Sequence, residues 1–304
     1  MLSRFSQLTL LLAALCSMPL CAQGVVDGFF HTEGRLSLTA GATRGTFDDF
    51  YVGEELSNPV PVHGKITQII YNVYGKYGIT DNLNLIVNVP FIDAEGAGPG
   101  DPINGEQQVS GLQDVTIMAH YRPFSTSFSG GQFDGLASAG VSLPGGYEPN
   151  GILSIGSGAF AADLKIGGHL QLTSGVFATA IAGYSLRGSA DDTFGVIEGE
   201  SFDVPNAINL MAKLGYAGGF FYVDGWIDYQ SSSDGVDIMG PGFTGNFPET
   251  KVDYTRVGLT GYMPINHYSG ISVSYGSVIS GRNLGKTTYL NAGLTIVFNE
   301  KKSE

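Results

Sequence analysis

Apolar and polar residues alternate along twelve short segments of this chain, and the last segment shows the pattern most clearly. From Leu290 to Phe298 the even-numbered positions are all apolar, whereas the odd-numbered positions are mostly small or polar. A period of two places successive side chains on opposite faces of a strand, so the two faces lie in different environments. About ten residues per segment, repeated many times with a weak signal each, is typical of a transmembrane β-barrel.

The segments are spread evenly, and no linker rich in Pro, Ser or charge separates them. We therefore predict one domain: an all-β, antiparallel up-and-down transmembrane β-barrel of about 12 strands. The predicted strands are 34–44, 65–77, 83–92, 112–122, 134–143, 159–172, 176–186, 207–217, 219–230, 254–263, 270–279 and 287–298.

The connections between these strands are alternately short and long. The short ones are 78–82, 173–175, 217–219 and 266–269, which are rich in residues that suit hairpin turns. The long ones are 45–64, 93–111, 144–158, 187–206 and 231–253. Outer-membrane barrels have short periplasmic turns and longer extracellular loops. A water-soluble sandwich or barrel, the alternative fold, has no reason to segregate loop lengths in this way.

The N-terminus has the order of a secretory signal peptide. Arg4 gives a positive start, Leu8 to Leu15 is apolar, and a small residue, Ala22, ends the stretch. We predict a cleaved signal peptide at residues 1–22 and a barrel domain at 23–304, located in a Gram-negative outer membrane. A buried N-terminal helix is the alternative. Both cysteines, Cys16 and Cys21, lie in the leader, so the mature chain is expected to contain no disulfide and no Cys-based metal site.

The composition suits an exported barrel. The chain has 45 glycines, 11% aromatic residues and only 14% charged residues, and no run of 18 apolar residues follows Gln23, so transmembrane helices are not expected. Without Arg4 there remain 28 acids against 14 bases, a net charge of −14. A chain this acidic is not expected to bind nucleic acid.

Several motifs resemble a known family. The stretch from Tyr77 to Leu85 (YGITDNLNL) is followed by VNVPF at 87–91 and by SGLQD at 110–114. Pro144-Gly145-Gly146 and the segment 280–283 (SGRN) are also similar. Together they resemble the family named for the MetA pathway of phenol degradation, whose members are outer-membrane transporter barrels. The resemblance implies uptake of small aromatic or apolar compounds.

The sequence departs from the family pattern at two places. Gln113 stands where the pattern usually has Gly, and six residues follow Phe298, although many outer-membrane barrels end on their terminal aromatic residue. The second departure weakens the signal that the barrel-assembly machinery is expected to recognise.

No constellation of residues predicts catalysis or metal binding. The five histidines are far apart without paired spacing, and no G-x-S-x-G motif occurs. We therefore predict no enzymatic activity and no cofactor, although a barrel lipase with Ser and His on neighbouring strands remains open because such pairs are spatial. The long loops are acidic but lack D-x-D-x-D spacing, so we expect solvated loops rather than divalent-cation sites.

The candidate lumen lining consists of charged and histidine side chains at the alternate strand positions that face inward. Facing lipid, such a charge would cost about 2–4 kcal/mol near the midplane. The candidates are Arg35, Lys76, His120, Arg122, Asp163, Lys165, His169, Lys213, Asp224, Asp228 and Arg256. They could form a pore lining that selects solutes or a salt-bridged plug, because twelve strands enclose a lumen that side chains can largely fill.

The function expected from the sequence is passive passage of small molecules through an outer-membrane barrel, either along the lumen or by lateral release of apolar solutes into the bilayer. The expected partners are outer-membrane lipids and lipopolysaccharide, the barrel-assembly machinery and the solutes themselves. The alternatives are a structural or display barrel with a plugged lumen and, third, a lipid-modifying barrel enzyme.

Overall fold

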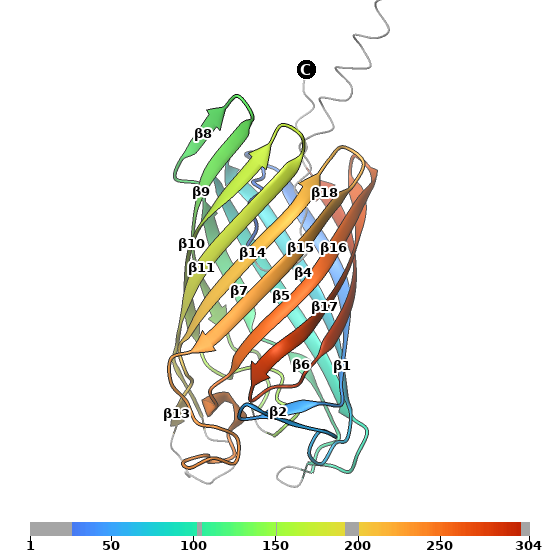
Figure 1. The fold of residues 1–304 in the computed structure, drawn as a ribbon, viewed down its shortest axis with the longest axis vertical. Coiled ribbons are helices and arrows are strands. Elements are labelled where there is room, and N and C mark those ends of the chain that lie inside the picture. Colours follow the sequence, from blue (N-terminus) through green and yellow to red (C-terminus); the bar gives the residue numbers. More distant parts are fainter. Residues whose placement is uncertain (1–25, 102–104, 150, 192–200, 299–304) are drawn as a thin grey trace, which may run out of the picture.

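In the computed structural model, antiparallel strands close into a barrel with twelve places around its circumference (Figure 1). The structure describes residues 26–101, 105–149, 151–191 and 201–298. The predicted signal peptide lies outside the described residues. The barrel strands are β1 (Leu36–Phe47), β4 (Ile66–Thr80), β5 (Leu83–Gly96), β6 (Gln108–Leu112) with β7 (Val115–Tyr121) in one position, β9 (Gly131–Leu143), β10 (Ala161–Leu172), β11 (Val176–Arg187), β14 (Ala207–Ala217), β15 (Tyr222–Ser232), β16 (Asp253–Asn266), β17 (Ser269–Arg282) and β18 (Thr288–Phe298). Strand β1 pairs with both β4 and β18, and β10 pairs with both β9 and β11, so the sheet has no break around the barrel. The predicted fold class is confirmed.

Every predicted strand has a counterpart, but three differences affect the barrel ends. The β4–β5 hairpin is longer than predicted, which reduces the turn between these strands to Asp81-Asn82. The predicted strand 112–122 is broken at Gln113-Asp114 into β6 and β7. An additional strand, β8 (Ser125–Phe128), follows β7 beyond Pro123, which has no N–H for the ladder, and pairs with the start of β9.

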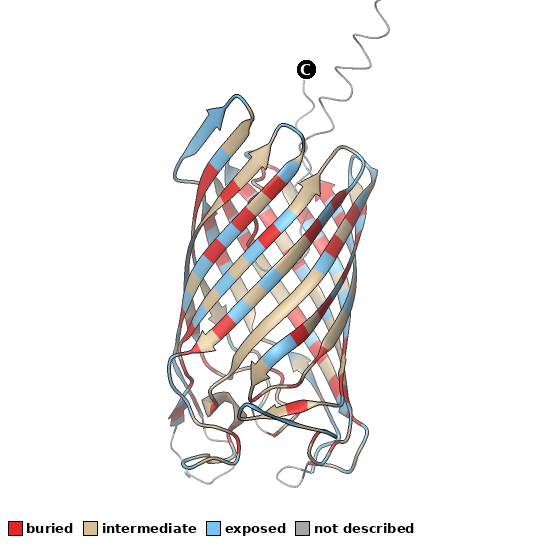
Figure 2. Cartoon of the chain, viewed as in Figure 1, coloured by how far each residue is buried: buried red, intermediate tan, exposed pale blue. Residues whose placement is uncertain are grey.

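Burial alternates along the strands as the sequence pattern predicts (Figure 2). In β18, Leu294 and Ile296 are exposed on the outer face, whereas Thr295 is buried and its hydroxyl lies 2.8 Å from that of Thr39 on β1. The same alternation in β10 exposes Leu164 and Ile166. The outer wall is therefore an apolar band, and the inner wall carries the polar residues. No helix among the described residues is long and apolar enough to cross a bilayer.

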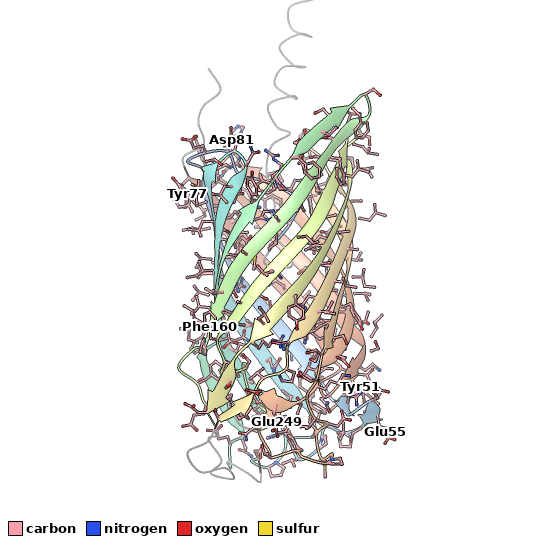
Figure 3. All side chains as sticks on the ribbon, turned by 90° about the vertical axis from the view of Figure 1, so that its left-hand side faces the viewer. Tyr51, Glu55, Tyr77, Asp81, Phe160 and Glu249 are labelled. Atoms are coloured by element: carbon pink, nitrogen blue, oxygen red, sulfur yellow. The ribbon has the colours of Figure 1, made fainter. Side chains whose placement is uncertain are left out.

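The two ends of the barrel differ in their connections. We call one the short-turn end, where the turns at 81–82, 173–175, 218–221 and 267–268 lie together with the β8–β9 hairpin. We call the other the long-loop end. Its connections include the hairpins β2 (Phe50–Val52)–β3 (Glu55–Ser57) and β12 (Ser189–Asp191)–β13 (Ser201–Asp203) and a 3-10 turn, η1 (Phe247–Glu249). Figure 3 shows Asp81 at the short-turn end and Glu55 and Glu249 at the opposite end.

Candidate functional site: a lumen filled at its short-turn end

Residues 26–34, which we call the luminal segment, precede β1 and fold into the lumen at the short-turn end instead of joining the sheet. Val26 is its deepest anchor, because it packs in a buried cluster with side chains from the surrounding wall. That cluster contains Tyr74, Ile86, Met118, Leu136 and Ile181, from β4, β5, β7, β9 and β11. The luminal segment thus contacts much of the barrel circumference at once.

A buried ion pair holds the segment to the wall. Asp27 Oδ1 lies 2.9 Å from Lys76 Nζ, and both side chains are almost fully buried. Lys76 Nζ also donates to the carbonyl oxygen of Phe29. Lys213 and Asp224 form a second buried contact at 4.0 Å. Removing one partner of a buried pair leaves an uncompensated charge, so the Asp27–Lys76 contact opposes movement of the segment.

Two consecutive phenylalanines fill the space beside these ions. Phe29 packs edge-on against Phe177, with centroids 5.2 Å apart, and against His169 at 4.8 Å. Phe30 stacks on His120 at 4.4 Å, and the guanidinium carbon of Arg122 lies 5.0 Å from the centre of the Phe30 ring. The lumen is therefore occupied by rings at this level.

Small residues permit this close packing. A Cβ on Gly28 would lie 2.0 Å from Nδ1 of His169, and a Cβ on Gly78 would lie 2.1 Å from the carbonyl oxygen of Thr32. At neither position can a side chain be added without moving the luminal segment.

The turn between β4 and β5 anchors the end of the luminal segment. The amide of Gly34 donates to the carbonyl of Gly78 at 2.8 Å, and the amide of Glu33 donates to Asp81 Oδ1 at 2.9 Å. Asn84 completes the anchor, because its side chain both accepts from the His31 amide and donates to the His31 carbonyl. The motif YGITDN that carries the family resemblance therefore builds a receptor for the luminal segment.

Between the two ends, the lumen wall is polar and charged. Arg256 on β16 pairs with Asp228 on β15, with Nε 3.1 Å from Oδ2, and lies 4.5 Å from the centre of the Tyr254 ring. Asp163 accepts a hydrogen bond from Ser185 at 2.5 Å. Lys165 forms no ion pair with any described residue. This stretch of the lumen presents charge without a segment lying against it.

An apolar cluster holds the loops of the long-loop end together, and we call it the mouth cluster. Its buried members are Phe47, Phe50, Val60, Ile66, Leu153 and Ile238, with Val52, Val109, Ile152, Phe243 and Phe247 packed against them. These residues come from the β1–β4, β9–β10 and β15–β16 connections and the adjoining strand ends. Three loops distant in sequence therefore share one small core.

Polar contacts from the segment 280–283 hold these loops together. The Arg282 guanidinium binds Asp237 through Nε at 2.8 Å and Nη2 at 2.7 Å, and Glu54 through Nη1 at 2.9 Å. Asn283, at φ 55°, accepts from the amides of Gly53 and Ile238. The hydrogen bond from Arg282, together with that from Asn283, lowers the pKa of Asp237 to about 2. The SGRN motif therefore binds loops at the mouth.

The barrel wall is weakest beside β6. Strand β7 pairs with β5 and β9, but within the described part of the chain β6 pairs with β5 alone. The β9–β10 loop covers the open edge: the Tyr147 hydroxyl donates to Asp114, and Ser157 Oγ lies 3.2 Å from the same carboxylate. Burial, then the Asp114 contact, raises the pKa of Tyr147, which stays protonated as a donor. We call this loop-covered edge the wall gap.

Gly145 explains the PGG motif at the same place. A Cβ on Gly145 would lie 1.7 Å from the carbonyl oxygen of Leu112, the last residue of β6. Only glycine allows the loop backbone to lie this close to the broken strand.

The eleven residues predicted from the sequence divide into two groups. Lys76, His120, Arg122 and His169 contact the luminal segment, Arg35 is buried directly after it, and Lys213 and Asp224 pair beside it. Asp163, Lys165, Asp228 and Arg256 lie in the polar middle. Sequence reasoning missed the luminal segment itself. Its only signal is Asp27 within an apolar and aromatic stretch, which needs a cation once buried.

Three histidines form hydrogen bonds with hydroxyls in the lumen. His31 Nε2 lies 2.7 Å from Ser37 Oγ, His120 Nδ1 lies 2.8 Å from Ser138 Oγ, and His169 Nδ1 lies 2.7 Å from Thr179 Oγ1. The second ring nitrogen of each has no hydrogen-bond partner among the described residues, so no carboxylate orients these rings. The described residues also contain no group of three His, Cys, Asp or Glu that could hold a metal ion.

The fold resembles solved outer-membrane barrels. The COG4313 outer membrane channel from Pseudomonas putida F1 shares 16% sequence identity with a TM-score of 0.70, covering 91% of this chain and 100% of that chain. The translocator domain of the autotransporter NalP from Neisseria meningitidis shares 12% identity with a TM-score of 0.50, covering 97% and 96%. These likenesses concern the fold.

Sequence comparison gives the family. No curated protein matches the chain. The family model described as "Putative MetA-pathway of phenol degradation" matches residues 62–294, which is more than half of the chain. The protein therefore belongs to this family of outer-membrane barrels.

Proposed function

We propose that the protein is an outer-membrane channel for passive passage of small molecules, with its short-turn end in the periplasm and its leader cleaved after export. The observation that carries this proposal is the luminal segment. It fills the lumen without pairing with a strand, and it continues into the barrel wall at β1. Such a segment can leave the lumen while every strand pair of the barrel stays intact.

Two routes follow from the geometry. Polar solutes and ions would pass along the lumen once the luminal segment has moved, because the middle of the lumen is lined by charges such as Lys165 and Arg256. Apolar solutes would leave through the wall gap, where the loop and not a strand covers β6. The family description supports small aromatic compounds as the solutes of this second route.

We infer no enzymatic activity. A Ser–His pair on neighbouring strands exists in His120 and Ser138, but both side chains are buried beneath Phe30, and no acid orients the imidazole. A hydroxyl nucleophile needs an oriented base and access to substrate, and this pair has neither.

A structural or display barrel is the second candidate, and the dense packing of the luminal segment favours it. Under that hypothesis the luminal segment is a permanent part of the core, comparable to the mouth cluster. The two candidates differ in whether the segment can be displaced with the barrel still folded.

Liposome swelling tests the proposal. Purified wild-type protein, a variant lacking residues 26–34 and the Gly28→Leu variant would be reconstituted and exposed to sugars and aromatic solutes of graded size. We expect the deletion and Gly28→Leu to increase sugar-driven swelling, because each removes the segment from its place beside His169. Thr32→Leu, at an exposed position of the same segment, is the matched control. A folded deletion variant that passes no more solute than wild type would favour the display barrel.

A further inference from the structure

The outward-facing cations of this barrel gather at one place. Among the described lysines and arginines, most point into the lumen, and Lys251 and Arg282 belong to the loop contacts at the mouth. Three others occupy outward-facing positions in or just before neighbouring strands: Lys65 before β4, Arg44 in β1 and Lys286 before β18. In a chain of net charge −13, these three cations are the outward-facing ones of the barrel strands that the structure describes.

Two of these cations, Lys65 and Lys286, line a cavity on the outer wall at the long-loop end. Its volume is about 330 Å³, and its lining contains Thr46, Phe47, Asp48, Asp49, Lys65, Ser277, Lys286 and Thr288. Thr46 is paired in register with Thr288 on β18 and Thr67 on β4, and Arg44 lies one outward step lower, in register with Leu290 and Ile69. The cavity therefore offers hydroxyl and ammonium donors with a guanidinium below them.

The wall changes character directly beneath the cavity. Large apolar and aromatic residues face outward at and below the level of Arg44, with Leu290 56%, Tyr275 54% and Tyr71 53% exposed. A barrel with this pattern places its apolar band in the hydrocarbon and its rim at the headgroups. The cavity thus lies where the headgroup of a lipid in the same leaflet would meet the barrel.

The acids in the lining leave the cations available. Asp49 lies 3.5 Å from the Lys286 ammonium and also accepts from Asn58, so it is already engaged. An ammonium has three donors, and Lys286 therefore keeps donors for another acceptor. Neither Lys65 nor Arg44 forms an ion pair with a described residue. In the lining, Lys65 and Lys286 accompany Asp48 and Asp49, and Arg44 lies below them. The outward acids Asp93 and Glu95 lie on β5, in register with Ile69 and Thr67.

We propose that this cavity binds a phosphate group of lipopolysaccharide, with acyl chains lying along Tyr71, Tyr275 and Leu290. Lys65 and Lys286 bind the phosphate oxygens from above, and Arg44, whose guanidinium suits phosphate geometry, binds from the hydrocarbon side. The site rests on the proposed orientation, in which the long-loop end meets the outer leaflet. It would fasten one lipid molecule to the β4–β1–β18 side of the barrel, across the pairing of the first and last strands.

Native mass spectrometry of the full-length barrel in detergent tests the site by titration with lipid A carrying both phosphates. The Arg44→Gln/Lys65→Gln variant leaves the Lys286–Asp49 contact intact, and we expect it to bind lipid A about 30-fold more weakly. Lys165→Gln/Lys251→Gln removes the same charge from the lumen and a loop, and it should bind like wild type. Lys65→Gln alone, at an exposed side chain, serves if the double variant does not fold.

Dephosphorylated lipid A and inorganic phosphate complete the test. We expect wild type and the double variant to bind dephosphorylated lipid A equally weakly, and inorganic phosphate to bind much more weakly than lipid A. Equal losses in both double variants would overturn the proposal, because net charge alone would then explain binding. Undiminished binding of dephosphorylated lipid A would also overturn it, and phosphate binding as tightly as lipid A would make this a site for the free ion. Solute passage measured by liposome swelling is independent of all these outcomes.

Discussion

The two ends of the lumen are held together by different physical means. At the short-turn end a single segment of nine positions, 26–34, contributes a buried ion pair, two packed phenylalanines and hydrogen bonds to one turn. At the long-loop end three separate loops share the mouth cluster and are bound by Arg282 and Asn283. The first arrangement depends on charges and rings in one continuous peptide. The second depends on an apolar core assembled from distant parts of the chain.

This difference indicates which end can open. The luminal segment is free of strand pairing, so it can leave as a unit at the cost of one buried ion pair, a few ring contacts and its hydrogen bonds to the β4–β5 hairpin. Opening the mouth requires several loops to lose a shared core together. We therefore expect the short-turn end to be the movable one, and the following changes test that expectation in order of decreasing effect.

Breaking the buried ion pair should have the largest effect. Asp27→Asn leaves the Lys76 ammonium buried without its partner, and breaking such a pair typically costs about 3–5 kcal/mol. We expect the luminal segment to leave the lumen, so that single-channel conductance rises and the segment becomes sensitive to protease. Asp27→Asn/Lys76→Met removes both charges and should restore closure. Unchanged conductance in the single variant would show that the two ends are equally fixed.

A cavity in the mouth cluster should destabilise the loops of the long-loop end and leave the short-turn end unchanged. Leu153→Ala removes a buried side chain, and such changes cost about 2–5 kcal/mol in a packed core. We expect faster hydrogen exchange in the three loops, with the luminal segment and the heat-modifiable gel mobility of the barrel unchanged. Leu143→Ala, at an exposed position at the end of β9, is the control. Exchange that rises at both ends would mean that the ends are coupled.

Removing positive charge from the lumen tests whether ions pass through it from one end to the other. Replacing Arg122 and Lys165 by Gln should shift ion selectivity toward cations by a modest factor, since salt partly screens a positive charge in an aqueous pore. Lys165→Gln alone should give most of the shift, because Lys165 has no ion pair among the described residues whereas Arg122 lies 3.4 Å from Asp134. Reversal potentials across a salt gradient measure it. A folded variant with unaltered selectivity would show that ions do not follow this wall.

The smallest expected effect concerns pH at the mouth. The Arg282 hydrogen bond, together with that from Asn283, lowers the pKa of Asp237 from 3.8 to about 2, so this contact is fully present above the unfolded pKa and is lost as pH falls toward about 2. Loop protection by hydrogen exchange should therefore be constant near neutral pH and decrease only in strong acid. Asp237→Asn should remove that dependence, and a decrease already at pH 5 would assign the effect to another group.

The sequence predicted the barrel because the period of two survives in nearly every strand, as Leu294 and Thr295 illustrate on opposite faces. It did not predict the break at Gln113-Asp114, because polar and apolar residues still alternate on either side of it. The inward charges were recognised by parity, but their partners were not. Asp27 meets Lys76 only through the folded path of a segment that has no periodicity.

The family motifs were visible in the sequence without their physical meaning. The structure gives three of these motifs a physical role. Gly78 and Asp81 contact the luminal segment, Gly145 allows a loop to lie against the end of β6, and Asn283 binds the mouth loops. Each acts through contacts with parts of the chain far away in sequence. Such contacts carry no local pattern, so the structure was needed to find them.

The seam between β1 and β18 also sets the order in which the molecule can be made. Thr39 and Thr295, whose hydroxyls meet there, are separated by 256 positions in the chain, so the ring closes only after the last strand has been delivered. Pairings this distant in sequence are slow to form. The luminal segment adjoins β1, one side of that seam, and until closure it has no enclosed space to occupy. The pairing of β1 with β18 and the entry of the luminal segment into the lumen are therefore expected in the same step of assembly.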